Sequence, residues 1–206
     1  DKTYQILLFI TVPAALGIMI LSPFIYHVLY EQSEMGATVL AHYAPVAILF
    51  ALFAVTASLL QGIDYQKWII FSLLTGILTK LVLNIPLIKW LQVDGAILAT
   101  AIGYGVTITI NIFVIHKALN YQSTMVRRRI LLIFILTGVM AVAVGVTIAV
   151  LNTFLSADTK LMAVVYCVVG VGVGASVYGL ISLRIGLAQK LLGAKVTKIA
   201  NKLGFK

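Results

Sequence analysis

The apolar positions of this chain fall into six long stretches separated by short segments that hold most of its charged residues. The stretches cover residues 4–30, 37–62, 68–88, 95–116, 130–153 and 161–183. A helix rises about 1.5 Å per residue, so about 20 apolar residues cross a hydrocarbon core roughly 30 Å thick. In lipid, helices and closed barrels are the folds that satisfy their own backbone polar groups. The pattern predicts an all-α polytopic membrane protein with six transmembrane helices.

The composition supports the same fold class. Hydrophobic residues make up 62% of the 206 residues, charged residues make up 10%, and the mean hydropathy is +1.10. The core of a single water-soluble domain could not enclose so many apolar side chains. The first stretch is too long for a signal-peptide core and has no small-residue cleavage site behind it. We expect it to remain in the mature protein. Because the chain opens at Asp1 instead of Met, we expect it to be the later part of a longer polypeptide.

Charged residues between the stretches predict the orientation, because short cytoplasmic loops collect Lys and Arg. One set of segments holds Lys2, Lys67, Lys117, Arg127, Arg128, Arg129, Arg184 and five C-terminal lysines. The alternate segments hold Lys89 and Lys160 beside Glu31, Glu34, Asp94 and Asp158. Both termini of the chain are therefore predicted to be cytoplasmic. Nucleic acid is not an expected partner despite the net charge of +9, since the basic residues flank apolar spans instead of forming one basic face with aromatics.

The segment 185–206 has an amphipathic helical pattern. Apolar residues Leu192, Val196, Ile199 and Leu203 share one face, and Lys195, Lys198 and Lys202 lie on an adjacent one. We expect this basic tail to lie on the inner leaflet, where acidic lipid headgroups attract each basic residue by about 1 kcal/mol. A specific lipid or partner site is the alternative interpretation.

Lys80 is the only Lys, Arg, Asp or Glu inside any of the six stretches. A charge near the bilayer centre costs about 3 kcal/mol on insertion scales, so it usually faces protein or water. Asn84 follows one helical turn later, and Thr100 is expected at a similar depth on the returning span. We expect these three residues to form a polar cluster.

Gln61, Thr107, Thr109 and Asn111 could extend this cluster into a polar path toward the cytoplasm. Two interpretations of Lys80 stay open. Either it is a cavity cation that attracts an anionic substrate group or replaces a transported cation, or it extends toward the surface and hydrogen-bonds to Asn84.

Small residues recur at helical spacing in two spans. Gly95, Ala99 and Gly103 predict a smooth face in the fourth span, which we expect to pack closely on a neighbouring helix, most simply the third. Gly170 and Gly174 predict a similar small-residue face in the last span. All four prolines, Pro13, Pro23, Pro45 and Pro86, lie within spans, which favours a protein that changes shape, although prolines are also commoner in membrane helices than in soluble ones.

Enzymatic and metal-binding patterns are missing from the sequence. It has no carboxylate pair for acid–base catalysis, no HExxH motif and no P-loop. The single cysteine, Cys167, cannot form a disulfide or a cysteine metal site within the chain. His27, His42 and His116 lie near span ends and are expected to be interfacial residues. We therefore expect no enzymatic activity, no metal and no cofactor.

Four phrases carry a family resemblance: ITVPAALGIMIL, ASLLQGIDYQKW, LTKLVLNIPLI and VDGAILATAIGYG. They resemble the multidrug/oligosaccharidyl-lipid/polysaccharide exporter superfamily, and within it most closely the lipid II flippases, which cross the membrane fourteen times with both ends in the cytoplasm. The chain would correspond to their last six spans. The resemblance implies four helices of the second transporter lobe in residues 1–120, two additional helices in 121–184 and the basic tail in 185–206.

The resemblance also implies a function in the bacterial cytoplasmic membrane. Such a carrier moves an undecaprenyl-pyrophosphate-linked sugar to the outer leaflet by alternating access, together with an N-terminal lobe missing from this chain and with membrane lipids around it. Some superfamily members couple to sodium or protons, and the Lys80 ammonium beside Asn84 and Thr100 could replace such an ion. The alternatives are a teichoic-acid, capsular polysaccharide or multidrug exporter of the same fold and, from another class, a non-transporting membrane scaffold or a membrane enzyme.

Overall fold

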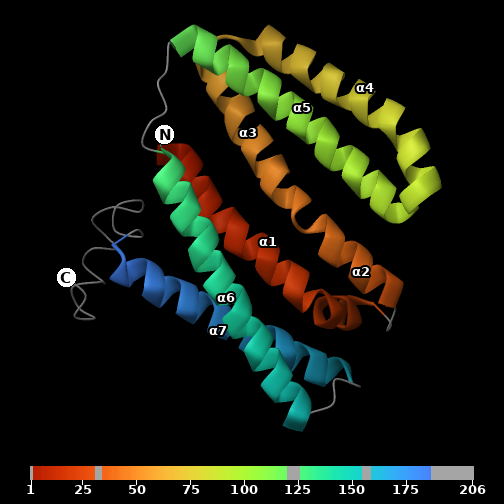
Figure 1. The fold of residues 1–206 in the computed structure, drawn as a ribbon, viewed down its shortest axis with the longest axis vertical. Helices are drawn as coiled ribbons and strands as arrows, with labels where there is room; N and C mark the ends of the chain where they lie inside the picture. Colours follow the sequence, from red (N-terminus) through yellow and green to blue (C-terminus); the bar gives the residue numbers. More distant parts are fainter. Residues whose placement is uncertain (1, 31–33, 120–125, 155–158, 187–206) are drawn as a thin grey trace. The chain divides into compact units, whose positions relative to one another are not determined.

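The computed structural model describes residues 2–30, 34–119, 126–154 and 159–186, and every regular element within them is an α-helix (Figure 1). The helices are α1 (Lys2–Leu29), α2 (Glu34–Tyr43), α3 (Val46–Gly62), α4 (Gln66–Leu91), α5 (Val93–Leu119), α6 (Val126–Phe154) and α7 (Lys160–Arg184). The predicted all-α fold class is confirmed. The predicted basic tail, with Lys195, Lys198 and Lys202, lies outside the described residues.

Within the described residues, six helical segments are long and apolar enough to cross a membrane, as the hydrophobic pattern predicted. Five are single helices, and the second, Met35–Gly62, consists of α2 and α3 joined at Ala44–Pro45. Proline lacks the N–H that would continue the helical hydrogen-bond ladder, so α2 ends just before this position. The chain is therefore a multi-pass membrane protein, and one of its spans is interrupted.

The chain forms two compact units. The first contains residues 1–41 and 125–206, and the second contains residues 42–124, so the boundary falls within α2 between Ala41 and His42. Helices α1, α6 and α7 belong to the first unit, and α3, α4 and α5 belong to the second. The predicted grouping into residues 1–120, 121–184 and 185–206 stays a prediction.

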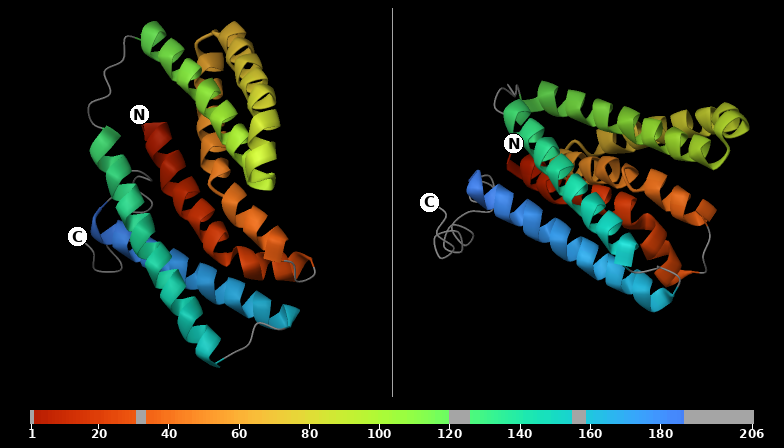
Figure 2. Two further views of the ribbon diagram at one scale, coloured as in Figure 1. Left: turned by 45° about the vertical axis from the view of Figure 1, so that its right-hand side comes forward. Right: turned by 60° about the horizontal axis from the view of Figure 1, so that its bottom comes forward.

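In the first unit, α1, α6 and α7 pack on one another, and both views of Figure 2 show them side by side. Tyr166 of α7 is fully buried and stacks on Phe24 of α1, with ring centroids 4.5 Å apart. Pro13 removes the N–H that would bond the carbonyl of Phe9 four residues earlier. The Tyr178 hydroxyl of α7 donates a hydrogen bond to this carbonyl oxygen at 2.9 Å. The irregular position in α1 is thus satisfied by a neighbouring helix, as backbone in lipid requires.

In the second unit, α4 and α5 form a tight antiparallel hairpin, and α3 packs on α5. The turn is short: Gln92 adopts a positive φ of 52° between the two helices. A Cβ atom added at Gly103 would lie 2.9 Å from the carbonyl oxygen of Gly76, and one added at Gly95 would collide with the Leu87 backbone. The close approach of α4 and α5 therefore depends on glycine at these positions.

The other residues that were predicted for helix packing also lie at helix contacts. Ala99 is fully buried on the same face of α5 as Gly95 and Gly103. In the first unit, Gly170 of α7 lies against Leu21 of α1, and Gly174 lies against Val144 of α6.

Candidate functional site

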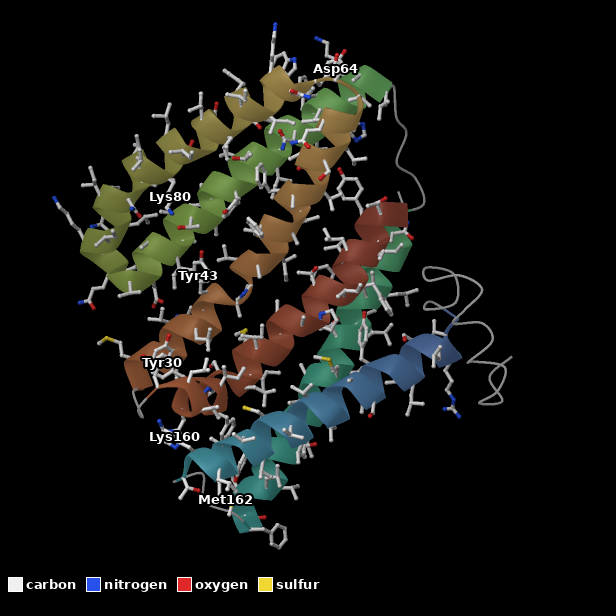
Figure 3. The ribbon with its side chains drawn as sticks, turned by 180° about the vertical axis from the view of Figure 1, so that it is seen from behind. Tyr30, Tyr43, Asp64, Lys80, Lys160 and Met162 are labelled. Atoms are coloured by element: carbon white, nitrogen blue, oxygen red, sulfur yellow. The ribbon has the colours of Figure 1, made fainter. Side chains whose placement is uncertain are left out.

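Lys80 is half-buried on the face of α4 that meets α5, and Figure 3 shows it beside this hairpin. Its Cβ lies 3.2 Å from the point where a Cβ of Gly103 would stand. The hairpin pairs Gly103 with Lys80 and Gly95 with Leu87. Asn84 lies between the paired positions on α4, and Thr100 lies between those on α5. The register therefore brings the three members of the predicted polar cluster to the same stretch of the hairpin.

The cluster holds an unused acceptor. The Asn84 Oδ1 atom is buried and has no hydrogen-bond partner among the described residues. The Thr100 hydroxyl donates to the carbonyl oxygen of Ala96 on its own helix at 2.8 Å. The Lys80–Asn84 hydrogen bond that one interpretation predicted is therefore not formed in the described part of the chain. A buried carbonyl oxygen without a donor in a membrane helix marks a place where a cation or a hydrogen-bond donor would be stabilised.

A separate network of buried polar side chains joins three helices of the second unit. Asn111 of α5 is fully buried; its Oδ1 accepts a hydrogen bond from the Ser72 hydroxyl of α4 at 2.6 Å. Its Nδ2 donates to the Thr56 hydroxyl oxygen of α3 at 3.2 Å. The Thr107 hydroxyl lies 3.2 Å from the Ser72 carbonyl oxygen and 3.0 Å from that of Gly103. Hydrogen bonds therefore link α3, α4 and α5 where apolar burial alone would not set their register.

The predicted polar path is not continuous within this unit. Gln61 is exposed on α3, and Thr109 is exposed on α5, where its hydroxyl bonds the Gly105 carbonyl of its own helix at 2.7 Å. Asn111 is fully buried and takes part in the three-helix network instead. Asn111 is therefore part of a packed helix contact and Gln61 and Thr109 lie at the surface, so the predicted path is not formed; Asn84 keeps a buried oxygen without a partner among the described residues.

Sequence reasoning missed Thr56 and Ser72. A hydroxyl in an apolar helix gives a weak signal because it can bond a carbonyl of its own helix, as Ser72 does with Ile69 at 3.0 Å. A stronger signal was present in the spacing. Ser72, Gly76, Lys80 and Asn84 recur at every fourth residue and so form one face of α4.

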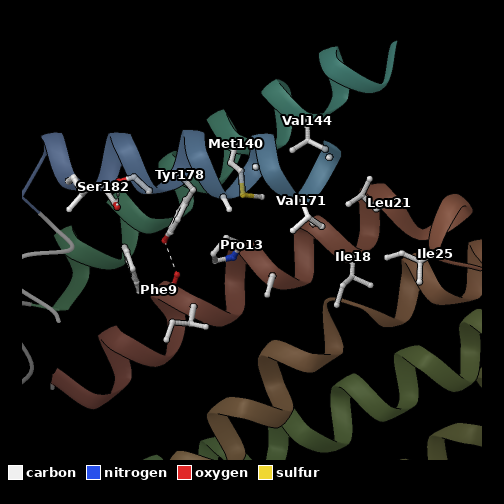
Figure 4. Close-up of a pocket in the computed structure, with 18 residues that line it drawn as sticks. Phe9, Pro13, Ile18, Leu21, Ile25, Met140, Val144, Val171, Tyr178 and Ser182 are labelled. Atoms are coloured by element: carbon white, nitrogen blue, oxygen red, sulfur yellow. Dashed lines mark hydrogen bonds between the residues drawn. The ribbon is translucent and has the colours of Figure 1, made fainter. Parts of the chain in front are cut away.

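The first unit holds an apolar cavity of about 670 Å³ between α1 and α7, with α6 at its base. Figure 4 shows Pro13, Ile18 and Leu21 of α1 opposite Val171, Tyr178 and Ser182 of α7. Gly17, Gly170, Gly174 and Gly179 also line it. The volume falls within the range of small-molecule sites, and the lining is almost wholly apolar. Such a cavity suits a hydrocarbon chain.

The sequence predicted Gly170 and Gly174 as packing residues, and both do contact neighbouring helices. It gave no signal for the cavity beside them, because the cavity depends on the angle between α1 and α7. Gly17 and Gly179 have open space where a Cβ would stand, so their missing side chains add to its volume.

Within residues 2–30, 34–119, 126–154 and 159–186, no group of three or more His, Cys, Asp or Glu side chains could hold a metal ion.

The sequence is similar to that of a known protein over most of its length. No family model matches the chain. The chain is 40% identical over 201 residues to the Lipid II flippase MurJ of Bacillus subtilis (strain 168). The similarity covers 95% of this chain and 37% of that protein, so the chain spans well under half of the relative's length. The resemblance to lipid II flippases, read from short sequence phrases, is confirmed as a similarity to part of such a protein.

The buried amide network gives a stability prediction. In the full-length protein, Asn111→Leu should lower the free energy of unfolding by about 1–2 kcal/mol, because membrane interhelical hydrogen bonds average about 0.6 kcal/mol and two are lost. The measurement is an unfolding titration in mixed detergent micelles. Thr109→Val, which removes only an exposed hydrogen bond within α5, should change the free energy of unfolding by less than about 0.5 kcal/mol. Equal effects of the two substitutions would contradict the structural role of Asn111.

Proposed function

We propose that this chain forms the last six spans of a lipid II flippase, a carrier that moves undecaprenyl-pyrophosphate-linked sugar across the bacterial cytoplasmic membrane. The observation that carries the proposal is the 40% identity to a lipid II flippase over 95% of the chain. The activity is that of a transporter and not of an enzyme. The carrier would work by alternating access, with the missing N-terminal lobe as the opposite wall of its cavity. In the orientation that the basic residues favour, both ends of this chain are cytoplasmic.

The apolar cavity of the first unit supports a lipid substrate. We propose that it holds part of the prenyl chain while the pyrophosphate and sugar travel through an aqueous path. Its walls come from α1 and α7 and carry few polar atoms, so burying hydrocarbon there is favourable. An apolar cavity accepts any hydrocarbon chain that fits, so selection of the substrate also requires contacts to its headgroup.

Lys80 supports a specific form of the transport mechanism. We propose that its ammonium takes the place of a carried cation between α4 and α5, in the stretch of the hairpin that also holds the buried Oδ1 of Asn84. A fixed positive charge beside this acceptor would disfavour binding of a second cation by like-charge repulsion. The lobe would then complete its cycle without a sodium ion at this position.

Complementation tests the proposed function. The full-length parent gene would be expressed in a bacterium depleted of its own lipid II flippase, and lipid II exposed at the outer leaflet would be measured. We expect exposure to be restored, and to be lost when the segment described here is deleted. No restoration by a protein shown to be expressed and inserted would contradict the lipid II assignment and favour a polysaccharide or drug exporter.

The apolar cavity gives a second prediction with a matched control in α7. Gly179 lines the cavity and Gly172 does not, and both have open space where a Cβ would stand. Gly179→Leu should lower lipid II transport by about five-fold or more, because it fills the place of the prenyl chain. Gly172→Leu should leave transport unchanged. Equal transport by both variants at equal expression would contradict the proposal that the apolar cavity holds the prenyl chain.

Lys80 gives a third prediction. Lys80→Ala should lower transport about five-fold or make it depend on sodium, since the site would lose its fixed cation. Lys80→Arg should retain sodium-independent transport because it keeps the charge. Transport would be followed in proteoliposomes with and without sodium. If Lys80→Ala kept both the rate and the ion dependence of the unchanged protein, the proposed role of Lys80 would be wrong.

A further inference from the structure

His42 and Asp94 are hydrogen-bonded to each other near the break in the second span. The Nδ1 atom of His42 lies 2.7 Å from Oδ1 of Asp94, and 52 positions separate the two residues in the sequence. His42 comes from the end of α2 and Asp94 from the first turn of α5. Both belong to the second compact unit, and their side chains are 46% and 51% exposed. The sequence placed both at an interface but did not pair them.

The pair lies where the helical path is interrupted. Because Pro45 has no N–H, α2 ends at Tyr43 and α3 starts at Val46. Across the junction the backbone bonds span three residues, from Ala47 N to the Ala44 carbonyl at 3.1 Å. Such a junction lets the direction of a helix change at little cost. His42 is the first residue of the second unit, so the contact with Asp94 lies within that unit.

Apolar side chains surround this pair on the side that faces the pocket. A pocket of about 360 Å³ lies beside it, and its remaining lining is apolar: Pro45, Val46, Leu49, Leu91, Ile97, Leu98 and Ala101. These residues come from the α2–α3 junction, α3, α4 and α5, and none of them titrates. Lys89 in the last turn of α4 and Tyr43 on α2 are exposed and do not line the pocket. His42 is the histidine of this pocket, and histidine is the residue type that ordinarily gains or loses a charge between about pH 5 and 8.

We propose that His42 and Asp94 form a proton-binding site that latches α2 to the α4–α5 hairpin. The proton comes from water and binds the imidazole at Nε2, while Nδ1–H is donated to the ionised Asp94. The acceptor is ionised in both states, so the hydrogen bond is charge-assisted throughout, and the imidazolium adds an ion-pair attraction to it. When the proton leaves Nε2 to water, the ring stays bonded through Nδ1–H but loses its charge. The weaker bond lets α2 turn at Ala44–Pro45.

Only the effect of the latch on the transport cycle rests on the proposed function. In the predicted orientation the α4–α5 turn lies on the outer side, so the site would take its proton from outside the cell. The proton concentration there would then set how readily the second span changes its bend during the transport cycle. The contact itself exists without any assumption about the substrate.

A distance measurement tests the latch independently of transport. In the full-length protein in phospholipid nanodiscs, spin labels would be placed at Tyr43→Cys and Trp90→Cys, with Cys167 and all other native cysteines replaced. We expect a narrow distance distribution at about pH 5.5 and a broader one at about pH 8, the narrow population falling about two- to five-fold. His42→Gln and Asp94→Asn should each give the broad distribution at both pH values. His116→Gln, which changes a histidine at the other end of α5, should keep the response.

Identical distributions at both pH values would overturn the latch, and so would a pH response that persists in His42→Gln. Lipid II transport would be measured separately on the same preparations. A protein that shows the pH-dependent distance but does not transport lipid II would contradict the proposed function while supporting the latch.

Discussion

Polar groups inside a membrane must find partners within the protein, and this requirement organises both units of the chain. Hydrocarbon offers no water to an unpaired carbonyl or amide, and each unsatisfied group costs several kcal/mol. The Tyr178 hydroxyl satisfies the Phe9 carbonyl that Pro13 deprives of its donor. Asn111 is satisfied by Ser72 and Thr56. The contact between Tyr178 and Phe9 and the register of three helices both meet this requirement.

The proposed function depends on two places that depart from complete pairing and close packing. Asn84 Oδ1 is buried without a donor among the described residues, and the half-buried Lys80 lies one turn away on the same helix. The apolar cavity along α1 and α7 is the opposite kind of exception, since glycines leave space where side chains would normally pack. The polar position belongs to the second unit and the apolar cavity to the first, and each supports the proposed function by itself.

The hydrophobic pattern predicted the fold well because the length and polarity of each span are local properties of the sequence. It placed Gly95 and Gly103 at a close helix contact, where a Cβ would collide with the neighbouring backbone. It could not predict that His42 meets Asp94 or that Ser72 meets Asn111, because those contacts depend on how helices far apart in sequence pack. The cavity between α1 and α7 was missed for the same reason, since it is formed by the space between helices.

The central claim, that this chain handles a lipid-linked oligosaccharide, is tested most directly by photocrosslinking. A photoreactive residue would be placed in the full-length protein at Val171, which lines the cavity, and in a second variant at Val168, which is similarly exposed on α7 but does not. Membranes containing radiolabelled lipid II would then be irradiated. The account predicts strong labelling of the Val171 variant, suppressed by excess unlabelled lipid II, and weak labelling of the Val168 variant. Equal labelling at both positions, unaffected by the competitor, would contradict it.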